Sequence, residues 1–314
     1  ASGKYDVEAA IDLPLSVREG DRGVYRLQLQ GRHALAVMKV LTGGNVPDPK
    51  FFHIAETTIA GRKVRALRHG MAGEPGFELY GPWEDQHMIR AAIVEAGREF
   101  NLRKIGADAY SVTGIESGWM PMPLPAIYHG EEMRPYREWL TTNHLETIGS
   151  LGGSYVSADI RDYYVDPIEL GYGNIIDWNR DFLGRDALDA KRAGQSRVKR
   201  SLRWNKDDVA GIMRDSLFPR AGLPPRYIAV PSPMYATFEA DCVMAGGSLV
   251  GLSQWSAYSA NAESFLSLAL MDLDHAEPGT EVTLLWGEPD SQRPSVDAHE
   301  LREIRAVVEP APYF

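Results

Sequence analysis

Cysteine is almost absent from the sequence, whose 314 residues include only one, Cys242. A single cysteine excludes an internal disulfide and a multi-thiolate metal site, and we interpret Cys242 as a small buried hydrophobic residue. Long apolar runs are absent as well, because no stretch approaches the roughly 18 to 20 continuous apolar residues that cross a bilayer. The first eight residues lack the basic and apolar regions of a secretory signal. We therefore expect a cytoplasmic protein without membrane contact.

Basic residues are outnumbered by acidic ones, 33 against 43, which gives a net charge of −10. Because nucleic-acid binding relies on clustered Lys and Arg, this balance argues against nucleic acid as a partner. The local exception is a basic stretch over residues 191–203, which contains Lys191, Arg192, Arg197, Lys199, Arg200 and Arg203. It is interpreted either as a solvated linker or as a basic rim that attracts an anionic ligand. The eight histidines have no His-x-x-x-His or other ligand spacing, so no metal site is predicted.

The most informative part of the chain is a glycine-acid loop, HGMAGEPGFE, at residues 69–78. Glycine removes the Cβ barrier to tight and left-handed geometry, so such a loop can approach a flat ligand closely. The loop leads into a predicted strand at residues 77–80. On this strand Phe77 and Leu79 share one face, and Glu78 points to the other face, where we expect a ligand.

The two halves of the chain differ in their hydrophobic pattern. Strands and amphipathic helices in the first half indicate an α+β layer, and short alternating runs beyond residue 195 indicate a small antiparallel barrel or sandwich. We therefore predict two domains, 1–194 and 195–314. The predicted strands are 25–30, 51–59, 63–68, 76–80, 227–230, 237–243, 247–254, 265–271 and 281–286, and the predicted helices are 31–41 and 84–100, one that follows Gly106, and a short one that opens within 180–188.

Several motifs, in order over nearly the whole chain, resemble the aminomethyltransferase (glycine cleavage T-protein) family. The resemblance implies a T-protein-like folate-binding core, a C-terminal antiparallel β-barrel domain and a one-carbon enzyme that uses tetrahydrofolate. Family members carry a substantial folded segment before the point where this chain begins, so we expect the upstream part of the folate-binding domain to be absent. The motifs are the loop 69–78, LQLQG at 27–31, DFLGRDAL at 181–188 and GSLVGLS at 247–253.

A departure from the T-protein pattern indicates a particular branch of the family. T-proteins carry Gly-Ala-Arg-Asp where this chain has GADAY at 106–110, and here an apolar, proline-stiffened run follows at 119–128. This version is similar to the tetrahydrofolate-dependent aryl O-demethylases that act on vanillate, 3-O-methylgallate or syringate. In those enzymes a tyrosine assists departure of the phenolic oxygen, and Tyr110 is its match. The resemblance further implies that Glu78 and Trp119 bind the cofactor.

The chemistry of aryl ether cleavage is consistent with these residues. Removal of the methyl group requires a nucleophile in line with it, which the resemblance implies is N5 of tetrahydrofolate, and a proton for the departing phenolate. An unperturbed tyrosine has a pKa of about 10, so it is protonated at neutral pH and can donate. A positioned acid contributes about 10² to 10⁴-fold in rate. We expect the Tyr110 hydroxyl to face the same cavity as Glu78, with no metal required.

Other interpretations remain open at this point. Without the resemblance, Tyr110 is a half-buried packing residue, Glu78 a solvent-facing charge, Trp119 either core or a stacking wall, and Glu116 a partner within its own helix. The competing functions are another folate-dependent methyl or aminomethyl transferase, acting on dimethylsulfoniopropionate or an aminomethyl donor, and a non-catalytic folate-binding protein. The preferred arene, the groups that hold its carboxylate (expected in the absent upstream segment) and the oligomeric state are left open. So is a contact between the basic stretch and the folate tail.

Overall fold

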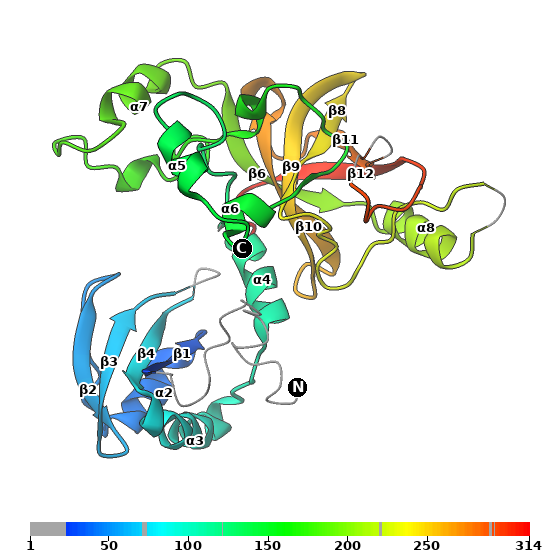
Figure 1. Ribbon diagram of the computed structural model, residues 1–314. Coiled ribbons are helices and arrows are strands. Elements are labelled where there is room, and N and C mark those ends of the chain that lie inside the picture. The colour runs from blue at the N-terminus through cyan, green and yellow to red at the C-terminus, as the bar shows by residue number, and fades with distance from the viewer. Residues whose placement is uncertain (1–22, 71–73, 121, 220–221, 289–290, 292) are drawn as a thin grey trace. The chain divides into compact units, whose positions relative to one another are not determined.

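The computed structural model describes residues 23–70, 74–120, 122–219, 222–288, 291 and 293–314. Three features noted in the sequence lie partly or wholly outside these residues: the first eight residues, positions 71–73 of the glycine-acid loop and Pro121 of the proline-stiffened run. Contacts divide the chain into two compact units, residues 1–105 and 106–314 (Figure 1). The predicted domain boundary, at 194–195, falls inside the second unit just before its first barrel strand.

The first unit is a four-stranded antiparallel sheet, in the order β1-β4-β3-β2, with two helices on one face. The core between them is built by period-two alternation, since Phe77 and Leu79 of the central strand β4 are fully buried against the helices. The elements are β1 (Val24–Gln30), α2 (Ala34–Leu41), β2 (Ile54–Ile59), β3 (Arg62–Arg68), β4 (Gly76–Pro82), η3 (Trp83–Asp85), α3 (Gln86–Ala96) and η4 (Arg98–Phe100).

The strands and helices predicted for this unit are present, but several of their boundaries differ. The helix predicted over 31–41 begins only at Ala34. Strand β2 begins at Ile54 rather than at residue 51, because Phe52 has a φ of 60°, which lies outside the extended region. The helix predicted over 84–100 is divided, and its α-helical part ends at Gly97. At that glycine an added Cβ would lie 2.3 Å from Leu102, so the chain turns there because Leu102 folds back against it.

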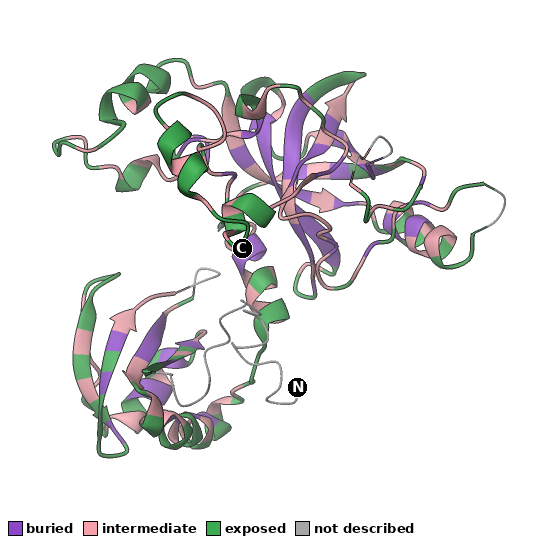
Figure 2. Cartoon of the chain, viewed as in Figure 1, coloured by how far each residue is buried: buried purple, intermediate pink, exposed green. Residues whose placement is uncertain are grey.

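The second unit contains a closed antiparallel barrel with the strand order β10-β6-β12-β11-β8-β9, which confirms the predicted C-terminal barrel. Its interior is filled by apolar side chains that include Trp204, Phe265, Leu284 and Trp286, and the buried strands stand out in Figure 2. The barrel strands are β6 (Arg197–Trp204), β8 (Asp241–Ala245), β9 (Ser248–Ser259), β10 (Ser264–Asp272), β11 (Glu281–Trp286) and β12 (Arg302–Glu309).

Helices and short segments surround the barrel in the second unit. They are α4 (Ala107–Glu116), α5 (Arg134–Trp139), α6 (Leu145–Ile148), α7 (Arg185–Arg192), α8 (Lys206–Leu217), the 3₁₀ turns η5 (Ile160–Tyr163), η6 (Gly173–Ile175) and η7 (Leu273–His275), and the two-stranded parallel sheet of β5 (Leu151–Gly152) and β7 (Phe238–Glu239). Within the described residues, no helix is long and apolar enough to cross a membrane.

Two predictions for this unit need correction. Residues 227–230 are not a strand, and the strand predicted over 237–243 is two, because β7 pairs with β5 while β8 joins the barrel. The helix expected to open within 180–188 is present and starts at Arg185, directly after Gly184, which has a φ of 89°.

Candidate functional site

Glu78 lies at the centre of the four-stranded sheet of the first unit, on the face opposite the helices. It belongs to the central strand β4, and its side chain is only 3% exposed. Arg26 of β1 donates to Oε1 over 2.8 Å, Nδ1 of His69 lies 2.9 Å from the same oxygen, and the Tyr80 hydroxyl donates to Oε2. The predicted orientation of Glu78 away from Phe77 and Leu79 is therefore what the structure has, and the carboxylate is buried rather than solvent-facing.

The partners of Glu78 keep its carboxylate ionised. Burial alone raises the pKa of Glu78, but hydrogen bonds from Tyr80 and Arg26 and the positive charges of Arg26 and His69 outweigh burial and lower that pKa below its usual range. A buried carboxylate that stays charged is a strong acceptor for a ligand with N–H donors.

Flat and polar side chains lie beside this carboxylate. Gln28 of β1 is the direct cross-strand neighbour of Glu78. On the other side, the rings of Phe51 and Phe52 lie 6.2 and 5.2 Å from the His69 ring, and both phenylalanines are more than half exposed. The glycine-acid loop in the sequence indicates His69, its first residue, as a candidate site residue. No pattern in the sequence indicates that Arg26 or Gln28 lies beside Glu78.

Tyr110 and Trp119 lie on α4 and directly after it, in the second unit. Tyr110 is half-buried, and among the described residues its hydroxyl has no hydrogen-bond partner. The helix begins after Gly106, as predicted, and ends at Glu116, two residues before Gly118, which has a φ of 68°. An added Cβ on Gly118 would lie 3.1 Å from the backbone of Pro312, so glycine is required there. Trp119 follows with 42% of its surface exposed, so it is not a core residue.

Helix α4 is fixed to the barrel by Glu116, which is 2% exposed. Its Oε1 accepts hydrogen bonds from the Ser259 hydroxyl at 2.5 Å and from the Asn261 amide at 3.1 Å. The expectation that Glu116 pairs within its own helix is therefore wrong, because its side chain reaches the β9–β10 hairpin. This attachment sets the position of Tyr110 and Trp119 relative to the barrel. Glu78 belongs to the other unit, so the cavity that Tyr110 and Glu78 are expected to share stays a prediction.

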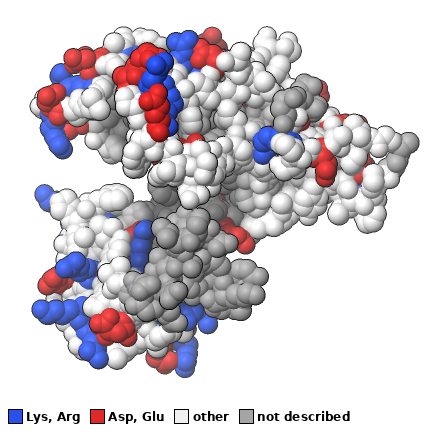
Figure 3. All heavy atoms as spheres, in the orientation of Figure 1, with Lys and Arg blue, Asp and Glu red and all other residues white. Residues whose placement is uncertain are grey.

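The basic stretch over residues 191–203 is not a linker, because β6 occupies most of it. Arg197 pairs with Glu169 at 2.9 Å and Arg203 with Glu309 at 3.0 Å. Lys199 is buried against the Tyr172 ring, and burial lowers its pKa to about 8. On the face drawn in Figure 3, basic and acidic side chains are intermingled.

A cleft of about 380 Å³ lies on the outside of the barrel, and it brings basic and acidic side chains together. Arg161 and Arg197 line it, but so do Asp162, Glu169 and Asp272. The interpretation of the basic stretch as a purely basic rim therefore fails for its member in this cleft, Arg197. Contact of the stretch with a folate tail stays untested.

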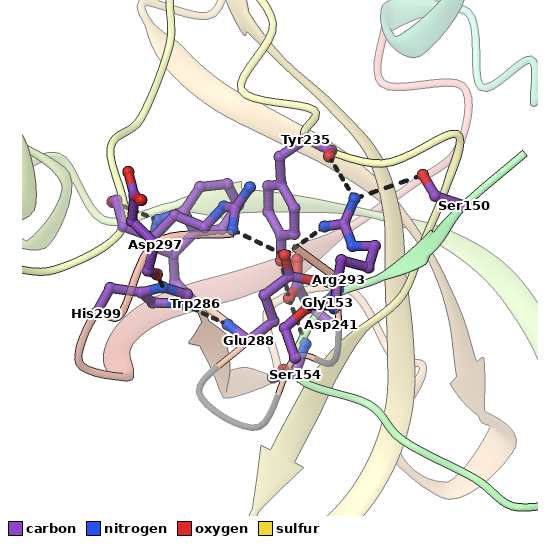
Figure 4. Close-up of polar contacts among 12 residues, drawn as sticks. Ser150, Gly153, Ser154, Tyr235, Asp241, Trp286, Glu288, Arg293, Asp297 and His299 are labelled. Carbon is purple, nitrogen blue, oxygen red and sulfur yellow. Dashed lines mark hydrogen bonds and ion pairs between the residues drawn. The ribbon is translucent and has the colours of Figure 1, made fainter. Parts of the chain in front are cut away.

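A second cluster of charges lies beside β5, β7, β8 and β11 (Figure 4), and no motif in the sequence indicates it. Glu288 is its centre, 4% exposed. Its Oε1 accepts from Arg226 at 2.9 Å and from Arg293, and its Oε2 accepts from the backbone N–H of Gly153 at 3.1 Å. The backbone N–H of Glu288 donates to Nε2 of His299 at 2.7 Å, which fixes the tautomer of that ring.

Two further carboxyls of this cluster are in an environment that favours protonation. Asp241 accepts from the Tyr235 hydroxyl at 2.9 Å and from the backbone N–H of Ser154 at 3.0 Å. Burial raises the pKa of Asp241 to about 7, and burial followed by the charge of Asp241 raises the pKa of Glu239 well above its usual range. The two acids therefore hold a proton that keeps the buried charge low.

Glu239 also faces a small cavity of about 10 Å³. Its Oε1 has no hydrogen-bond partner among the described residues. The cavity has room for about one water-sized group, so it is too small for an arene ring. Its walls include Met122, Leu124, Leu151, Tyr163, Phe238 and Trp255. No group of three or more His, Cys, Asp or Glu side chains within the described residues has the arrangement of a metal site.

Comparisons with known proteins give the family. Residues 6–123 match the model of the GCVT N-terminal domain. The whole chain aligns over 317 residues, at 42% identity, with syringate O-demethylase of Sphingobium sp. (strain SYK-6), and covers 68% of that protein. The chain belongs to the aminomethyltransferase-like (T-protein) family. As expected from the sequence, it is similar to an aryl O-demethylase of that family.

Other members of the T-protein family are more distant. A sesamin methylene transferase of Sinomonas sp. (strain No.22) is 31% identical, and the alignment covers 91% of this chain and 64% of that protein. An aminomethyltransferase of Streptomyces avermitilis is 26% identical over 84% of this chain and 56% of its own length. The aminomethyltransferase T of the glycine cleavage system from Bartonella henselae shares the fold, with a TM-score of 0.52 at 15% identity over 92% of this chain and 60% of that one.

Proposed function

We propose that the protein is a tetrahydrofolate-dependent aryl O-demethylase. It moves a methyl group from a methoxylated aromatic acid, of the vanillate, 3-O-methylgallate or syringate type, to N5 of tetrahydrofolate. The observation that carries this proposal is the 42% identity to syringate O-demethylase along the whole chain.

The surroundings of Glu78 fit a pterin ring. The 2-amino-pyrimidinone edge of a pterin presents two parallel N–H donors, which match the two oxygens of a carboxylate. Glu78 is charged and 3% exposed, so water competes little for it. When bound, tetrahydrofolate supplies the nitrogen nucleophile that accepts the methyl group. Gln28, next to Glu78 across the sheet, lies on the same face.

Tyr110 supplies the proton in this proposal. As the bond between the methyl carbon and the ether oxygen breaks, its electron pair stays on the oxygen, and the Tyr110 hydroxyl donates the proton that makes the product a neutral phenol. Tyr110 then recovers a proton from solvent, and solvent takes up the proton that N5 of tetrahydrofolate gives up on methylation, so the exchange balances. Among the described residues the Tyr110 hydroxyl has no hydrogen-bond partner, which is consistent with a group free to donate to a ligand. Trp119, exposed at the end of α4, provides a ring against which the pterin or the arene stacks.

A second candidate is transfer of a different one-carbon group. The 31% identity to a sesamin methylene transferase and the 26% identity to an aminomethyltransferase favour it. The replacement of the T-protein Gly-Ala-Arg-Asp segment by GADAY at residues 106–110 speaks against the aminomethyl reaction, because it places a phenol where a proton donor for a phenolate is needed.

The test is turnover by the full protein with tetrahydrofolate and vanillate, 3-O-methylgallate or syringate in separate reactions. We expect a demethylated catechol and 5-methyltetrahydrofolate in equal amounts. Dimethylsulfoniopropionate and an aminomethyl donor are tested as alternative methyl or one-carbon donors in separate reactions. Turnover of one of these, with none of the methoxybenzoates, would replace the O-demethylase assignment, and tetrahydrofolate binding without any turnover would indicate a non-catalytic folate-binding protein.

A further inference from the structure

Arg26 is an exposed side chain among those that surround the Glu78 carboxylate. Its side chain is 58% exposed, whereas His69 is 16% exposed and Glu78 is 3% exposed. Its guanidinium also lies over the Tyr80 ring, 5.9 Å from the ring centre. Arg26 therefore reaches the Glu78 carboxylate from the solvent side. His69, which lies beside the same oxygen, Oε1, is the less exposed of the two side chains.

Arg26 and Tyr80 each take one acceptor site of the Glu78 carboxylate. A carboxylate offers about four acceptor sites, two on each oxygen. Arg26 donates to Oε1 and Tyr80 donates to Oε2, while Nδ1 of His69 lies 2.9 Å from Oε1 without a hydrogen bond to it. A pterin edge needs one site on each oxygen, so on Oε1 it meets Arg26 as a competing donor and the His69 ring close by.

Arg26 and the pterin edge offer the carboxylate the same chemistry. A guanidinium is planar and presents parallel N–H donors that suit a carboxylate, as the amino group and ring N–H of an aminopyrimidinone do. The Arg26 end of this pair is 58% exposed, so its guanidinium can return to water when a ligand takes its place on the carboxylate.

We propose that Arg26 competes with the pterin for Glu78 and thereby sets the affinity of the site. This inference rests on the proposed function, in which Glu78 binds the pterin. In the free protein Arg26 occupies Oε1, and ligand binding requires it to leave, while His69 and Tyr80 continue to orient the carboxylate. The apparent dissociation constant is then the intrinsic one divided by the fraction of molecules in which Arg26 has moved away.

The experiment compares Arg26→Gln with wild type, using calorimetry on the full protein with tetrahydrofolate and with a tetrahydropterin that lacks the glutamate tail. Loss of the competing pair is expected to tighten both ligands about two- to fivefold. Arg65→Gln is the matched control, because Arg65 is exposed, lies on the same face of the sheet opposite Tyr80, and carries the same charge. The affinity of Arg65→Gln for both ligands should stay at the wild-type value. Such a result would show that the tighter binding of Arg26→Gln comes from lost competition and not from the loss of one positive charge.

Salt provides a second readout. Screening weakens the Arg26–Glu78 pair, so raising the salt concentration should narrow the difference between wild type and Arg26→Gln for the tail-free pterin. Unchanged or weaker binding by Arg26→Gln would overturn the competition and make Arg26 a residue that supports the carboxylate. Failure of the proposed function would look different: wild type would not bind tetrahydrofolate, or Glu78→Gln would bind it as tightly as wild type.

Discussion

At the scale of single residues, the charge of Glu78 is the feature on which cofactor binding depends. Glu78→Gln keeps the shape of the side chain and removes the charge that faces the N–H edge of the pterin. Loss of a charged hydrogen bond costs about 1.5 to 3 kcal/mol, so tetrahydrofolate affinity should fall about tenfold or more. Affinity for the methoxybenzoate, measured in the same calorimeter, should fall less.

The control for this change is Glu56→Gln on β2. Glu56 is exposed, and it faces the same side of the sheet through its pairing with Arg65. It should leave both affinities unchanged. If Glu78→Gln bound tetrahydrofolate like wild type, the pterin would have to be held by another group.

Tyr110 is the residue that tests the mechanism. Tyr110→Phe keeps the ring and its packing and deletes the proton that the phenolate needs. The expected result is a fall in kcat of about 10² to 10⁴-fold with folate affinity and fold retained. Single-turnover assays and calorimetry measure the two quantities separately. Near-normal turnover would mean that water or another group protonates the phenolate, and an unfolded variant would indicate that Tyr110 serves packing.

Sequence reasoning identified Glu78 but not its partners, and the reason is topological. The alternation of Phe77, Glu78 and Leu79 was enough to place the carboxylate away from the core. Arg26 meets it only because β1 pairs with β4 rather than with β2, the strand that follows next in sequence. Glu116 was misread for a similar reason, since its partners Ser259 and Asn261 lie more than 140 residues away.

At the scale of elements, the β2–β3 hairpin contains a strained turn. Ile59 pairs with Arg62 across the two-residue loop Ala60-Gly61, in which both residues have positive φ, 50° and 75°. Such a loop favours Asn-Gly, because asparagine tolerates the left-handed region better than alanine does. Ala60→Asn should therefore raise the free energy of unfolding by about 0.5–1 kcal/mol.

Urea denaturation followed by far-ultraviolet circular dichroism measures this change. Ala60→Val is the opposite control, because a β-branched side chain is strongly disfavoured at positive φ, and it should lower stability. A lower midpoint for Ala60→Asn would show that the turn is not limited by backbone strain.

The charge of strand β6 explains why the sequence does not predict it. The strand has a basic residue at four of its eight positions, Arg197, Lys199, Arg200 and Arg203, a composition that indicates a solvated linker or a basic rim. It is a strand because Leu202 and Trp204 alternate with these residues and enter the barrel core. Residues 227–230 show the reverse case, a β-like composition without a partner strand.

At the scale of the whole molecule, the cluster around Glu288 could not be foreseen, because its members come from segments that only the closed barrel brings together. Five charged groups take part: Glu239, Asp241, Glu288, Arg226 and Arg293. Three acids face two guanidiniums, so one negative charge is left over unless a carboxyl is protonated. The raised pKa of Asp241 and of Glu239 follows from this imbalance and from burial, and it makes the stability of the second unit depend on pH.

The last prediction follows from the sign of that dependence. Burial raises the pKa of Asp241 to about 7, above the value of about 3.9 for an aspartate in an unfolded chain. Between these values the native state holds a proton that the unfolded state has released. The contribution of Asp241 to the free energy of unfolding is therefore fully present below about pH 4 and is lost as the pH rises through about 7.

Asp241→Asn resembles the protonated acid and can still accept hydrogen bonds from Tyr235 and Ser154. Relative to wild type it should therefore be more stable at pH 7.5 than at pH 5, by urea denaturation followed through tryptophan fluorescence, which reports mainly on residues 106–314 because six of the seven tryptophans lie there. Asp186→Asn, at a side chain that is 98% exposed, should keep the wild-type dependence on pH. Equal slopes for wild type and Asp241→Asn between pH 5 and 7.5 would show that Asp241 is ionised in the native protein and that the proton lies elsewhere in the cluster.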